Sequence, residues 1–193
     1  MLSYKESLKI LKETDALIEG HFILSSGLHS DKYIQCAKLL SKPQKAKDLC
    51  QSLAEKINEN FNDFNLILSP AVGGIVIGYE IGRLLNVETI FAERVNKIFQ
   101  LRRGFEIKKK QRVVILEDVI TTGKSSLECS KLVDNNQGEI LGYACLIDRS
   151  NGKSQINKKI ISQIEIQIPT YEKNNLPSHL QKIKAIKPGS RSL

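Results

Sequence analysis

The fold is decided by the stretch Arg112-Val-Val-Ile-Leu-Glu-Asp-Val-Ile-Thr-Thr-Gly-Lys-Ser-Ser126. Its apolar run over residues 113–116 is rich in β-branched side chains, which is typical of a strand buried on both faces of a sheet. Two neighbouring acids, Glu117 and Asp118, end this strand, and a turn of small hydroxyl and glycine residues then opens a helix expected over about 125–135. A buried strand, a short turn and a helix in this order predict one unit of a parallel α/β sheet.

The same alternation of short apolar runs with helical segments continues on both sides of this stretch. Strands are expected over residues 66–68, 87–92, 140–147 and 160–168, and helices over about 43–57 and 75–85. Residues 93–111 hold seven basic side chains without a clear period, so we expect a long loop or hairpin there. The predicted fold class is α/β, with a central parallel sheet covered by helices on both faces. Because ligands of such sheets bind at the carboxyl ends of the strands, the site is expected in the loops that follow them.

The two ends of the chain show weaker patterns. Ser3 and Glu6 form the signature of a helix start, and apolar residues at helical spacing predict a first helix that reaches Gly20. Residues 21–40 are expected to form short strands and turns, and the polar segment after Thr170 is expected to be a surface extension. The expected division of one compact domain is an amino-terminal part over 1–40, an α/β core over 41–170 and a carboxy-terminal extension over 171–193.

The composition is that of a globular protein. The chain has 193 residues, of which 41% are hydrophobic and 26% charged, and this excludes a disordered or fibrous chain. No apolar run is long enough to cross a bilayer, and the amino terminus does not resemble a signal peptide, so we expect a cytoplasmic protein without a membrane partner. The four cysteines are scattered without the spacing of zinc ligands, and we expect reduced thiols that are mostly buried.

The net charge of +8 leaves two interpretations open. It can reflect a solvated basic surface, or it can attract an anionic partner such as nucleic acid or a phosphorylated small molecule. The absence of tryptophan and the aromatic content of only 6% count against a base-stacking surface for single strands. The charge alone does not decide among these classes of partner.

The turn after the acid pair has the properties of a phosphate site. The first backbone N–H groups of a helix are unpaired and lie at the positive end of its dipole, and Thr121, Thr122 and Ser125 add hydroxyl donors. Carboxylates repel phosphate, so Glu117 and Asp118 are expected to accept hydrogen bonds from sugar hydroxyl groups or to hold a divalent cation. The structural alternative is a helix cap that follows two exposed turn residues. The occurrence of both features at one strand end favours a site for a ribose phosphate.

The same stretch resembles the phosphoribosyl-diphosphate-binding motif of type I phosphoribosyltransferases, in which an apolar strand, two acids and a threonine–glycine loop follow one another. The acid-pair motif is shared by the whole superfamily. The Ser-Gly segment near the amino terminus and the Asp-Arg-Ser segment after the strand over 140–147 narrow the resemblance to orotate phosphoribosyltransferases. The segments that resemble this branch are Gly20-His-Phe-Ile-Leu-Ser-Ser-Gly27, Ser30-Asp-Lys-Tyr33, Gly73-Gly-Ile-Val76, Phe91-Ala-Glu-Arg94, Leu101-Arg-Arg-Gly-Phe105, Asp148-Arg-Ser150 and Lys187-Pro-Gly-Ser-Arg191.

The resemblance implies a reaction, a cofactor and an assembly. The family transfers the 5-phosphoribosyl group of 5-phosphoribosyl 1-diphosphate to orotate, which gives orotidine 5′-monophosphate and diphosphate in pyrimidine (UMP) biosynthesis. Mg²⁺ is the implied cofactor, held mainly through the substrate and not by direct protein ligands. A homodimer is implied, in which the loop over residues 93–111 closes over the neighbouring subunit's site, and no nucleic acid partner is expected. Within the type I fold, residues 1–40 would form a helix and a hood on the orotate side.

The transition state of this reaction has oxocarbenium character, so catalysis is expected from charge stabilisation and positioning and not from a side-chain nucleophile. By resemblance, Glu117 and Asp118 would be catalytic residues that contact the ribose hydroxyl groups. Gly73 and Gly74 would bind the diphosphate, because glycine lets backbone N–H groups approach closely. The turn that would hold the 5′-phosphate consists of Val119, Ile120, Thr121, Thr122, Gly123, Lys124 and Ser125.

Orotate would be bound from three parts of the chain. The guanidinium fork of Arg149 suits the orotate carboxylate, and Thr121 would approach the same ring. Tyr33, followed by Ile34, matches the residues that cover the orotate ring. Ser25 stands on the orotate side where many members of the family have a lysine.

The basic loop carries the remaining expected contacts. Arg94 matches a diphosphate-binding arginine of the family, and Arg102 or Arg103 would be the catalytic cation that neutralises the leaving diphosphate. After Arg94 the sequence departs from the lysine and histidine pattern of many members. A second departure is Val72-Gly73, which replaces an aromatic–lysine pair.

Two other functions stay open at this point. A phosphoribosyltransferase for another base, such as a purine, would share the acid-pair motif, although a neutral purine offers no carboxylate to Arg149. A non-catalytic regulator that binds nucleic acid on the same fold would account for the positive charge. The histidines His21, His29 and His179 are expected to be isolated structural or surface residues.

Overall fold

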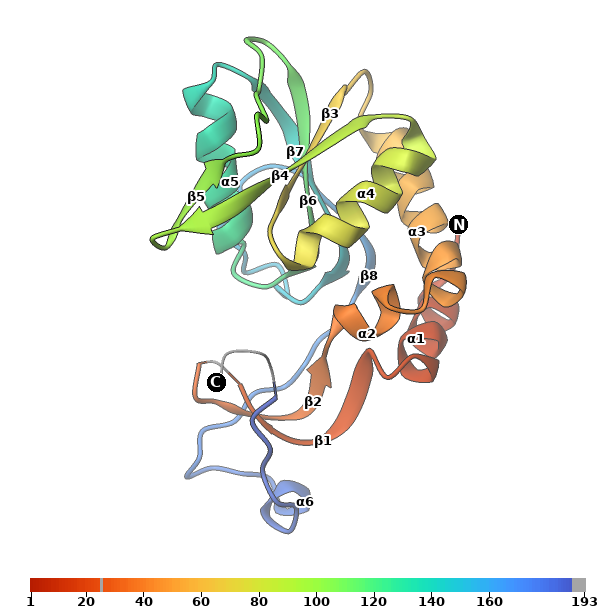
Figure 1. Ribbon diagram of the computed structural model, residues 1–193. Helices are drawn as coiled ribbons and strands as arrows, with labels where there is room; N and C mark the ends of the chain where they lie inside the picture. Colours follow the sequence, from red (N-terminus) through yellow and green to blue (C-terminus); the bar gives the residue numbers. More distant parts are fainter. Residues whose placement is uncertain (25, 189–193) are drawn as a thin grey trace.

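The computed structural model describes residues 1–24 and 26–188. Within these residues a central sheet has six strands in the order β5-β4-β3-β6-β7-β8 (Figure 1). All neighbouring strands are parallel except β4 and β5, which form an antiparallel hairpin. The strands are β3 (Leu66–Pro70), β4 (Glu88–Val95), β5 (Ile98–Leu101), β6 (Arg112–Ile120), β7 (Glu139–Asp148) and β8 (Ile160–Glu165).

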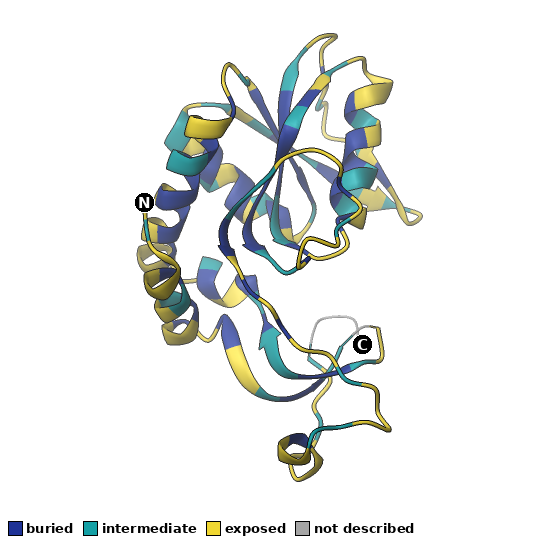
Figure 2. Ribbon diagram, turned by 180° about the vertical axis from the view of Figure 1, so that it is seen from behind, coloured by how far each residue is buried: buried dark blue, intermediate teal, exposed yellow. Residues whose placement is uncertain are grey.

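Helices cover both faces of this sheet, as the sequence predicts. The helices α3 (Pro43–Asn60) and α4 (Gly73–Leu85) pack on one face, and α5 (Lys124–Asn135) packs on the other. Successive side chains of β6 point to opposite faces of the sheet, which explains this arrangement. Val114 and Leu116 point into the core under α3 and α4, whereas Val113 and Ile115 point into the core under α5. Seen from behind, the strands of the sheet are largely buried (Figure 2).

Helix α4 packs unusually close to the sheet because three glycines recur every four residues along it. A Cβ atom at Gly78 would collide with the side chain of Ser69, and one at Gly82 with Thr89. A Cβ atom at Gly74 would lie 3.1 Å from Ser69 Cβ. The close packing holds the amino-terminal end of α4 directly at the carboxyl end of β3.

A smaller layer lies below the carboxyl ends of the core strands (Figure 1), and we call it the hood. It consists of the antiparallel strands β1 (Leu17–Ile23) and β2 (His29–Ile34). The segment over residues 171–188 lies against both: His29 N donates to Tyr171 O at 2.9 Å, and Ile23 N donates to Ile186 O at 2.8 Å. The remaining helices are α1 (Tyr4–Glu13), α2 (Cys36–Leu40) and α6 (Ser178–Gln181).

The first helix is shorter than predicted, and the prediction that it reaches Gly20 was wrong. Helix α1 has the expected capping box at Ser3 but ends at Glu13. The Thr14 hydroxyl group donates to Ile10 O at 2.8 Å, and Asp15 adopts a positive φ of 56°, so the chain turns out of the helix there. The apolar residues after this turn belong to β1.

The prediction that the histidines are isolated was also wrong for two of them. His21 and His29 are buried in the hood, with His21 Nε2 2.7 Å from His29 Nδ1. His21 Nδ1 lies 2.8 Å from the carbonyl oxygen of Ile183, so it must be the donor there. The pairing depends on strands β1 and β2 meeting, which spacing along the chain does not reveal.

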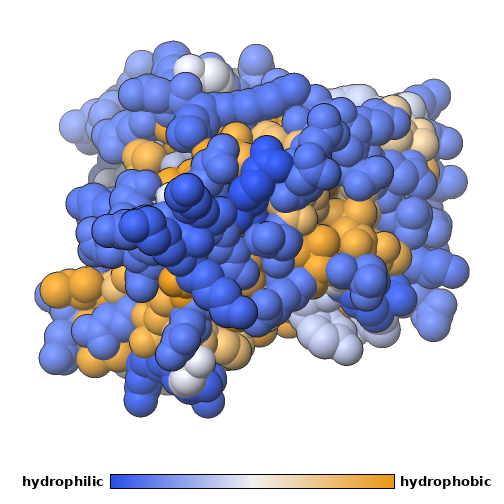
Figure 3. Space-filling model, turned by 90° about the horizontal axis from the view of Figure 1, so that it is seen from above, coloured by the Kyte–Doolittle hydropathy of each residue, from blue (hydrophilic) through white to orange (hydrophobic). Residues whose placement is uncertain are grey.

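Other expectations can be checked directly. All four cysteines are free and buried, which confirms the prediction of reduced, buried thiols. Across the described residues, we find no helix that has both the length and the apolar character to span a membrane. Viewed from above, the end of the molecule away from the hood is mostly hydrophilic, with smaller apolar patches between the polar side chains (Figure 3).

Candidate active site

The acid pair lies at the carboxyl end of β6, on the side of the core that faces the hood (Figure 1). The strand runs through both acids to Ile120, so the prediction that it ends at the acids was wrong. The reason is its pairing with β7, which continues from Arg112 opposite Glu139 to Ile120 opposite Asp148. The acids are therefore held by a rigid strand and not by a loop.

The two acids are half-buried and differ in their surroundings. Glu117 Oε2 accepts a hydrogen bond from the Ser126 hydroxyl group at 2.6 Å. Burial raises the pKa of Glu117 to about 7, and the Ser126 hydrogen bond opposes this shift. Asp118 Oδ1 accepts the N–H of Val119 at 2.9 Å, and burial raises the pKa of Asp118 as well. The charged form of both carboxyl groups is therefore incompletely solvated. A ligand that donates hydrogen bonds to them would replace the missing water.

The turn after β6 is shaped by Gly123. This residue has a positive φ of 78°, and a Cβ atom on it would lie 2.8 Å from the side chain of Ile156. The turn is also tied to the loop before Ile156, since Gln155 N donates to Thr122 O at 3.0 Å. The side chains of Thr121 and Thr122 are exposed, and α5 begins directly afterwards at Lys124. The predicted phosphate turn thus precedes the amino terminus of a helix, with hydroxyl groups facing solvent.

The glycine turn at the start of α4 meets the acid pair directly. A Cβ atom on Gly73 would lie 2.8 Å from each carboxylate oxygen of Asp118. Only a glycine therefore lets Asp118 lie against the first turn of α4. The structure brings together the predicted diphosphate turn, the acid pair and the phosphate turn, which come from three separate segments of the chain.

Arg149 follows β7 at the same edge of the sheet. Its backbone N–H donates to Ile120 O at 2.8 Å, which fixes it beside the end of β6. Among the described residues its Nε atom is buried without a hydrogen-bond partner. Burial lowers the pKa of Arg149, while the Tyr33 and Cys36 side chains, which are close enough to act on it, raise it. A guanidinium whose Nε atom is buried and has no partner among the described residues offers a place for an anion.

The hood contributes aromatic side chains to this region. Tyr33 of β2 lies with its ring 5.7 Å from the ring of Phe22 in β1. The Cys36 thiol, at the start of α2, lies 3.9 Å from the carbonyl oxygen of Asp118. Helix α2, which directly follows the hood strand β2, therefore contacts the backbone of the acid pair. Ser25, which the sequence also predicts on this side, lies outside the described residues.

The first part of the predicted basic loop forms the β4–β5 hairpin, which ends at Leu101. Two of the three arginines of the loop have partners in the described chain. Arg94 forms an ion pair with Glu128 of α5, donates to Lys97 O at 2.7 Å and lies over the ring of Phe99. Arg103 binds both carboxylate oxygens of Glu93 at 2.9 Å. These partners were not predicted, because they depend on the hairpin geometry.

Arg102 differs from its neighbour. It is exposed, and we find no hydrogen bond or ion pair of its side chain within the described chain. Over the same residues, no hydrogen bond or ion pair joins Arg102 or Arg103 to the acid pair. The positive charge of Arg94, in contrast, is close enough to Glu117 to lower its pKa.

Sequence comparison identifies the family to which this arrangement belongs. Residues 38–182 match the phosphoribosyl transferase domain family. The chain is 42% identical to the orotate phosphoribosyltransferase of Rhizorhabdus wittichii over 97% of its own length and 96% of the relative's. It is 46% identical to that of Parvibaculum lavamentivorans over 96% and 97% of the two chains. The chain belongs to the orotate phosphoribosyltransferase family.

Solved structures agree with this assignment at the level of the fold. An orotate phosphoribosyltransferase from Aeropyrum pernix superposes with a TM-score of 0.73 at 24% identity, covering 82% of this chain and 92% of the other. An adenine phosphoribosyltransferase from Thermoanaerobacter pseudethanolicus gives 0.62 at 21% identity, over 70% and 88% of the two chains. The predicted type I phosphoribosyltransferase fold and the predicted class of enzyme, a pentosyltransferase, are confirmed. Because adenine enzymes share the fold, the base must be argued from the site.

Proposed function

We propose that the protein transfers the 5-phosphoribosyl group from 5-phosphoribosyl 1-diphosphate to orotate and releases diphosphate. The observation that carries the choice of base is Arg149, whose buried Nε atom has no hydrogen-bond partner among the described residues. Orotate carries a carboxylate, which matches a guanidinium fork, whereas uracil and the purines do not. Tyr33 of the hood lies near this guanidinium and would cover the ring of the base.

The donor sugar would lie across the three segments that meet at the end of β6. Glu117 and Asp118 would accept hydrogen bonds from the ribose hydroxyl groups, and the turn that ends at Gly123 would hold the 5′-phosphate at the start of α5. The diphosphate would lie at the first turn of α4, where Gly73 leaves the backbone open. The bond from the anomeric carbon to the diphosphate oxygen breaks, and its electron pair leaves with the diphosphate. A ring nitrogen of orotate forms the new bond to the anomeric carbon, and the proton of that nitrogen passes to water.

The acid pair would then act by electrostatics. The anomeric carbon becomes positive as the bond breaks, and two carboxylates fixed on a strand stabilise that charge without rearranging. The opposite charge grows on the diphosphate, and Arg102 is the proposed cation for it. Arg103 would first have to give up its two-point contact with Glu93, whereas Arg102 has no such partner in the described chain.

Mg²⁺ is the proposed cofactor, and the residues present fit an ion held mainly by substrate oxygens. The described residues contain no group of three or more histidine, cysteine or acidic side chains that could hold a metal. Magnesium keeps several water ligands and is commonly held by substrate phosphates, so the diphosphate of the donor would supply its main contacts. Bound in this way, the ion supplies positive charge to the diphosphate. We propose that the reaction takes place in the cytoplasm, in line with the four free thiols.

The proposal is tested by exchanging the acceptor base in an assay of diphosphate release. We expect release with orotate and none above background with uracil or hypoxanthine, because neither offers a carboxylate to Arg149. The product of the orotate reaction should be orotidine 5′-monophosphate by mass. Equal rates with uracil would overturn the assignment of the base, and release with hypoxanthine alone would favour a purine enzyme.

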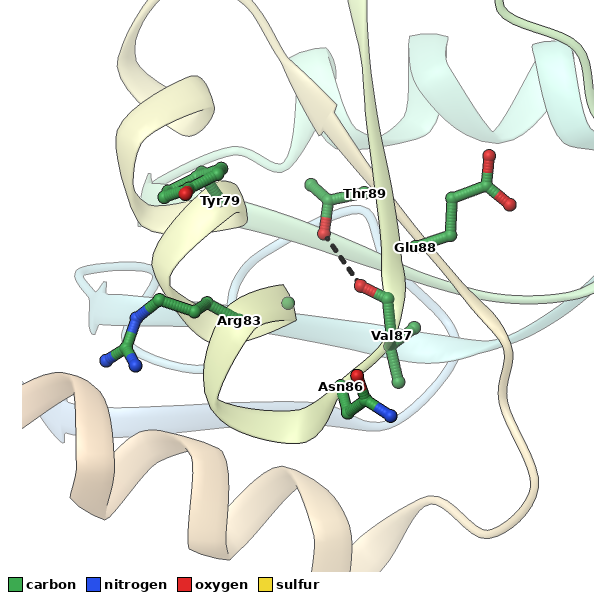
Figure 4. A pocket seen from close by; sticks show the side chains of 7 residues that line it. Tyr79, Arg83, Asn86, Val87, Glu88 and Thr89 are labelled. Carbon is green, nitrogen blue, oxygen red and sulfur yellow. Dashed lines mark hydrogen bonds between the residues drawn. The ribbon is translucent and has the colours of Figure 1, made fainter.

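We further propose a homodimer formed through α4. Val72, Val76 and Tyr79 recur along one side of this helix and are 82%, 52% and 68% exposed, an unusual row of exposed apolar side chains. Tyr79 and Arg83 project from successive turns beside the groove between α4 and the start of β4 (Figure 4). In the proposed dimer, the loop over residues 93–111 of one subunit would close over the neighbouring subunit's site.

A negative charge in this row should separate the subunits. Tyr79→Glu would bury an unpaired carboxylate in the interface, which should weaken association by about a hundredfold or more. Sedimentation velocity measures the change from dimer to monomer. Asn135→Glu adds the same single negative charge at the exposed end of α5, on the opposite face of the sheet, and should leave the dimer intact. A wild-type protein that sediments as a monomer would contradict the proposal.

A further inference from the structure

Ser126 contacts the acid pair from inside the protein. It is the third residue of α5 and is completely buried. Its hydroxyl group donates to Glu117 Oε2 at 2.6 Å, a distance typical of a hydrogen bond to a charged acceptor. Within the described chain, Glu117 Oε1 has no hydrogen bond. One oxygen of this carboxylate is therefore held by the helix, and the other is left for a ligand.

The backbone of Ser126 is held by the next turn of α5. Ser130 Oγ donates to Ser126 O at 3.2 Å, and the Tyr143 hydroxyl group of β7 donates to Ser130 Oγ at 3.0 Å. This chain of contacts anchors α5 to the strand next to β6. The Ser126 hydroxyl group is thus a preorganised donor and does not need to reorient when a substrate binds.

We infer that Ser126 is a positioning residue, which fixes the Glu117 carboxylate so that its free oxygen receives a ribose hydroxyl group of the donor. This inference rests on the proposed function, and Ser126 itself touches no substrate in it. A serine at this point has a clear physical reason. A buried carboxylate needs a partner for the oxygen that faces the protein, and an alanine would leave that oxygen unpaired.

The same contact controls the charge on Glu117. Burial raises the pKa of Glu117 to about 7 and the Asp118 charge adds to the rise, while the Ser126 hydrogen bond and the Arg94 charge lower it. Removal of the hydroxyl group therefore raises the pKa further, so that less of the carboxylate is ionised at neutral pH. The other titratable groups that face Glu117 are the thiols Cys129 of α5 and Cys145 of β7, and burial raises the pKa of both. Those thiols stay neutral, so the acid limb of the pH profile reports the acid pair.

The test is Ser126→Ala, followed by steady-state kinetics over a range of pH. We expect the KM for 5-phosphoribosyl 1-diphosphate to rise about tenfold, the usual effect of losing a hydrogen bond to a charged group. The acid limb of kcat/KM should move to higher pH, while the KM for orotate changes little. Ser52→Ala is the matched control, because it removes a buried hydroxyl group from α3 that accepts the N–H of Leu2, away from the acid pair. It should leave the pH profile where it is.

A double-mutant cycle with Glu117→Gln shows whether Ser126 acts through Glu117. In the background of the Glu117→Gln variant, the effect of Ser126→Ala on the KM should disappear, because the amide has no charge to hold. Additive effects in the cycle, or a wild-type pH profile for Ser126→Ala, would overturn the inference while leaving the proposed function intact. A wild-type protein that makes no orotidine 5′-monophosphate would instead overturn the proposed function.

Discussion

Asp118→Asn should lower kcat by about 10²–10³-fold while the protein stays folded. Asp118 Oδ1 accepts the N–H of Val119, so the amide of the variant would keep its oxygen towards Val119. The NH₂ group would then face the ribose hydroxyl groups, where an acceptor is needed. The variant would also lose a negative charge beside the anomeric carbon, which becomes positive in the transition state.

The stability of this variant separates a catalytic effect from misfolding. Burial raises the pKa of Asp118 above its value in the unfolded chain, so ionised Asp118 destabilises the folded state at neutral pH. The loss of stability begins as the pH rises through the pKa that Asp118 has in the unfolded chain. It is complete above the pKa of Asp118 in the folded protein. The neutral amide of the variant removes this destabilisation. We therefore expect its thermal midpoint at pH 7 to be equal to or above that of the wild type. Asp134→Asn, on the exposed side of α5, is the control and should change neither quantity. Unchanged turnover of Asp118→Asn would refute the assignment of the acid pair.

The sequence predicts the core and the position of the acid pair in the fold because both depend on neighbouring residues. A β-branched run such as 113–116 fits only a buried strand, and the acids and hydroxyl residues that follow it are covalently linked to that strand. Their place at the sheet edge then follows from the topology of parallel sheets. The same reasoning places Gly73 and Arg149 at the same edge, since each comes after a predicted strand.

The parts that sequence reasoning missed are contacts between distant segments. The bridges that join Tyr171 and Ile186 to the hood leave no periodic pattern, because each involves a single residue pair. The His21–His29 contact needs β1 and β2 to meet with a bulge in β1. These contacts depend on register between strands, and register is set by the whole packed structure.

The Ser126 contact with Glu117 was missed for a related reason. It requires that β6 continue through the acids and that α5 begin at Lys124, so that the third helical residue points back at the strand. An error of one residue in either boundary would turn the hydroxyl away. Helix and strand boundaries are the least certain part of any inference from sequence.

Arg149→Met should raise the KM for orotate by about 10²–10³-fold and, at the same time, stabilise the ligand-free protein. The two effects have opposite signs because the Nε atom of this half-buried guanidinium is itself buried and has no hydrogen-bond partner in the described chain. Without orotate that group lacks the hydrogen bonds it would have in water, and methionine fills similar space without a charge. With orotate the guanidinium gains its carboxylate, which methionine cannot supply.

Steady-state kinetics at varied orotate concentration and thermal denaturation without ligand measure the two effects of Arg149→Met separately. Arg149→Lys keeps the charge but not the planar fork, so its KM for orotate should fall between those of the wild type and Arg149→Met. Arg112→Gln is the control, because Arg112 is paired with Asp63 and Glu139 at the opposite end of β6. A variant Arg149→Met that loses both stability and orotate binding would indicate a structural role for the guanidinium. Retained orotate binding with higher stability would mean that the carboxylate lies elsewhere, and the choice of orotate as the base would lose its support.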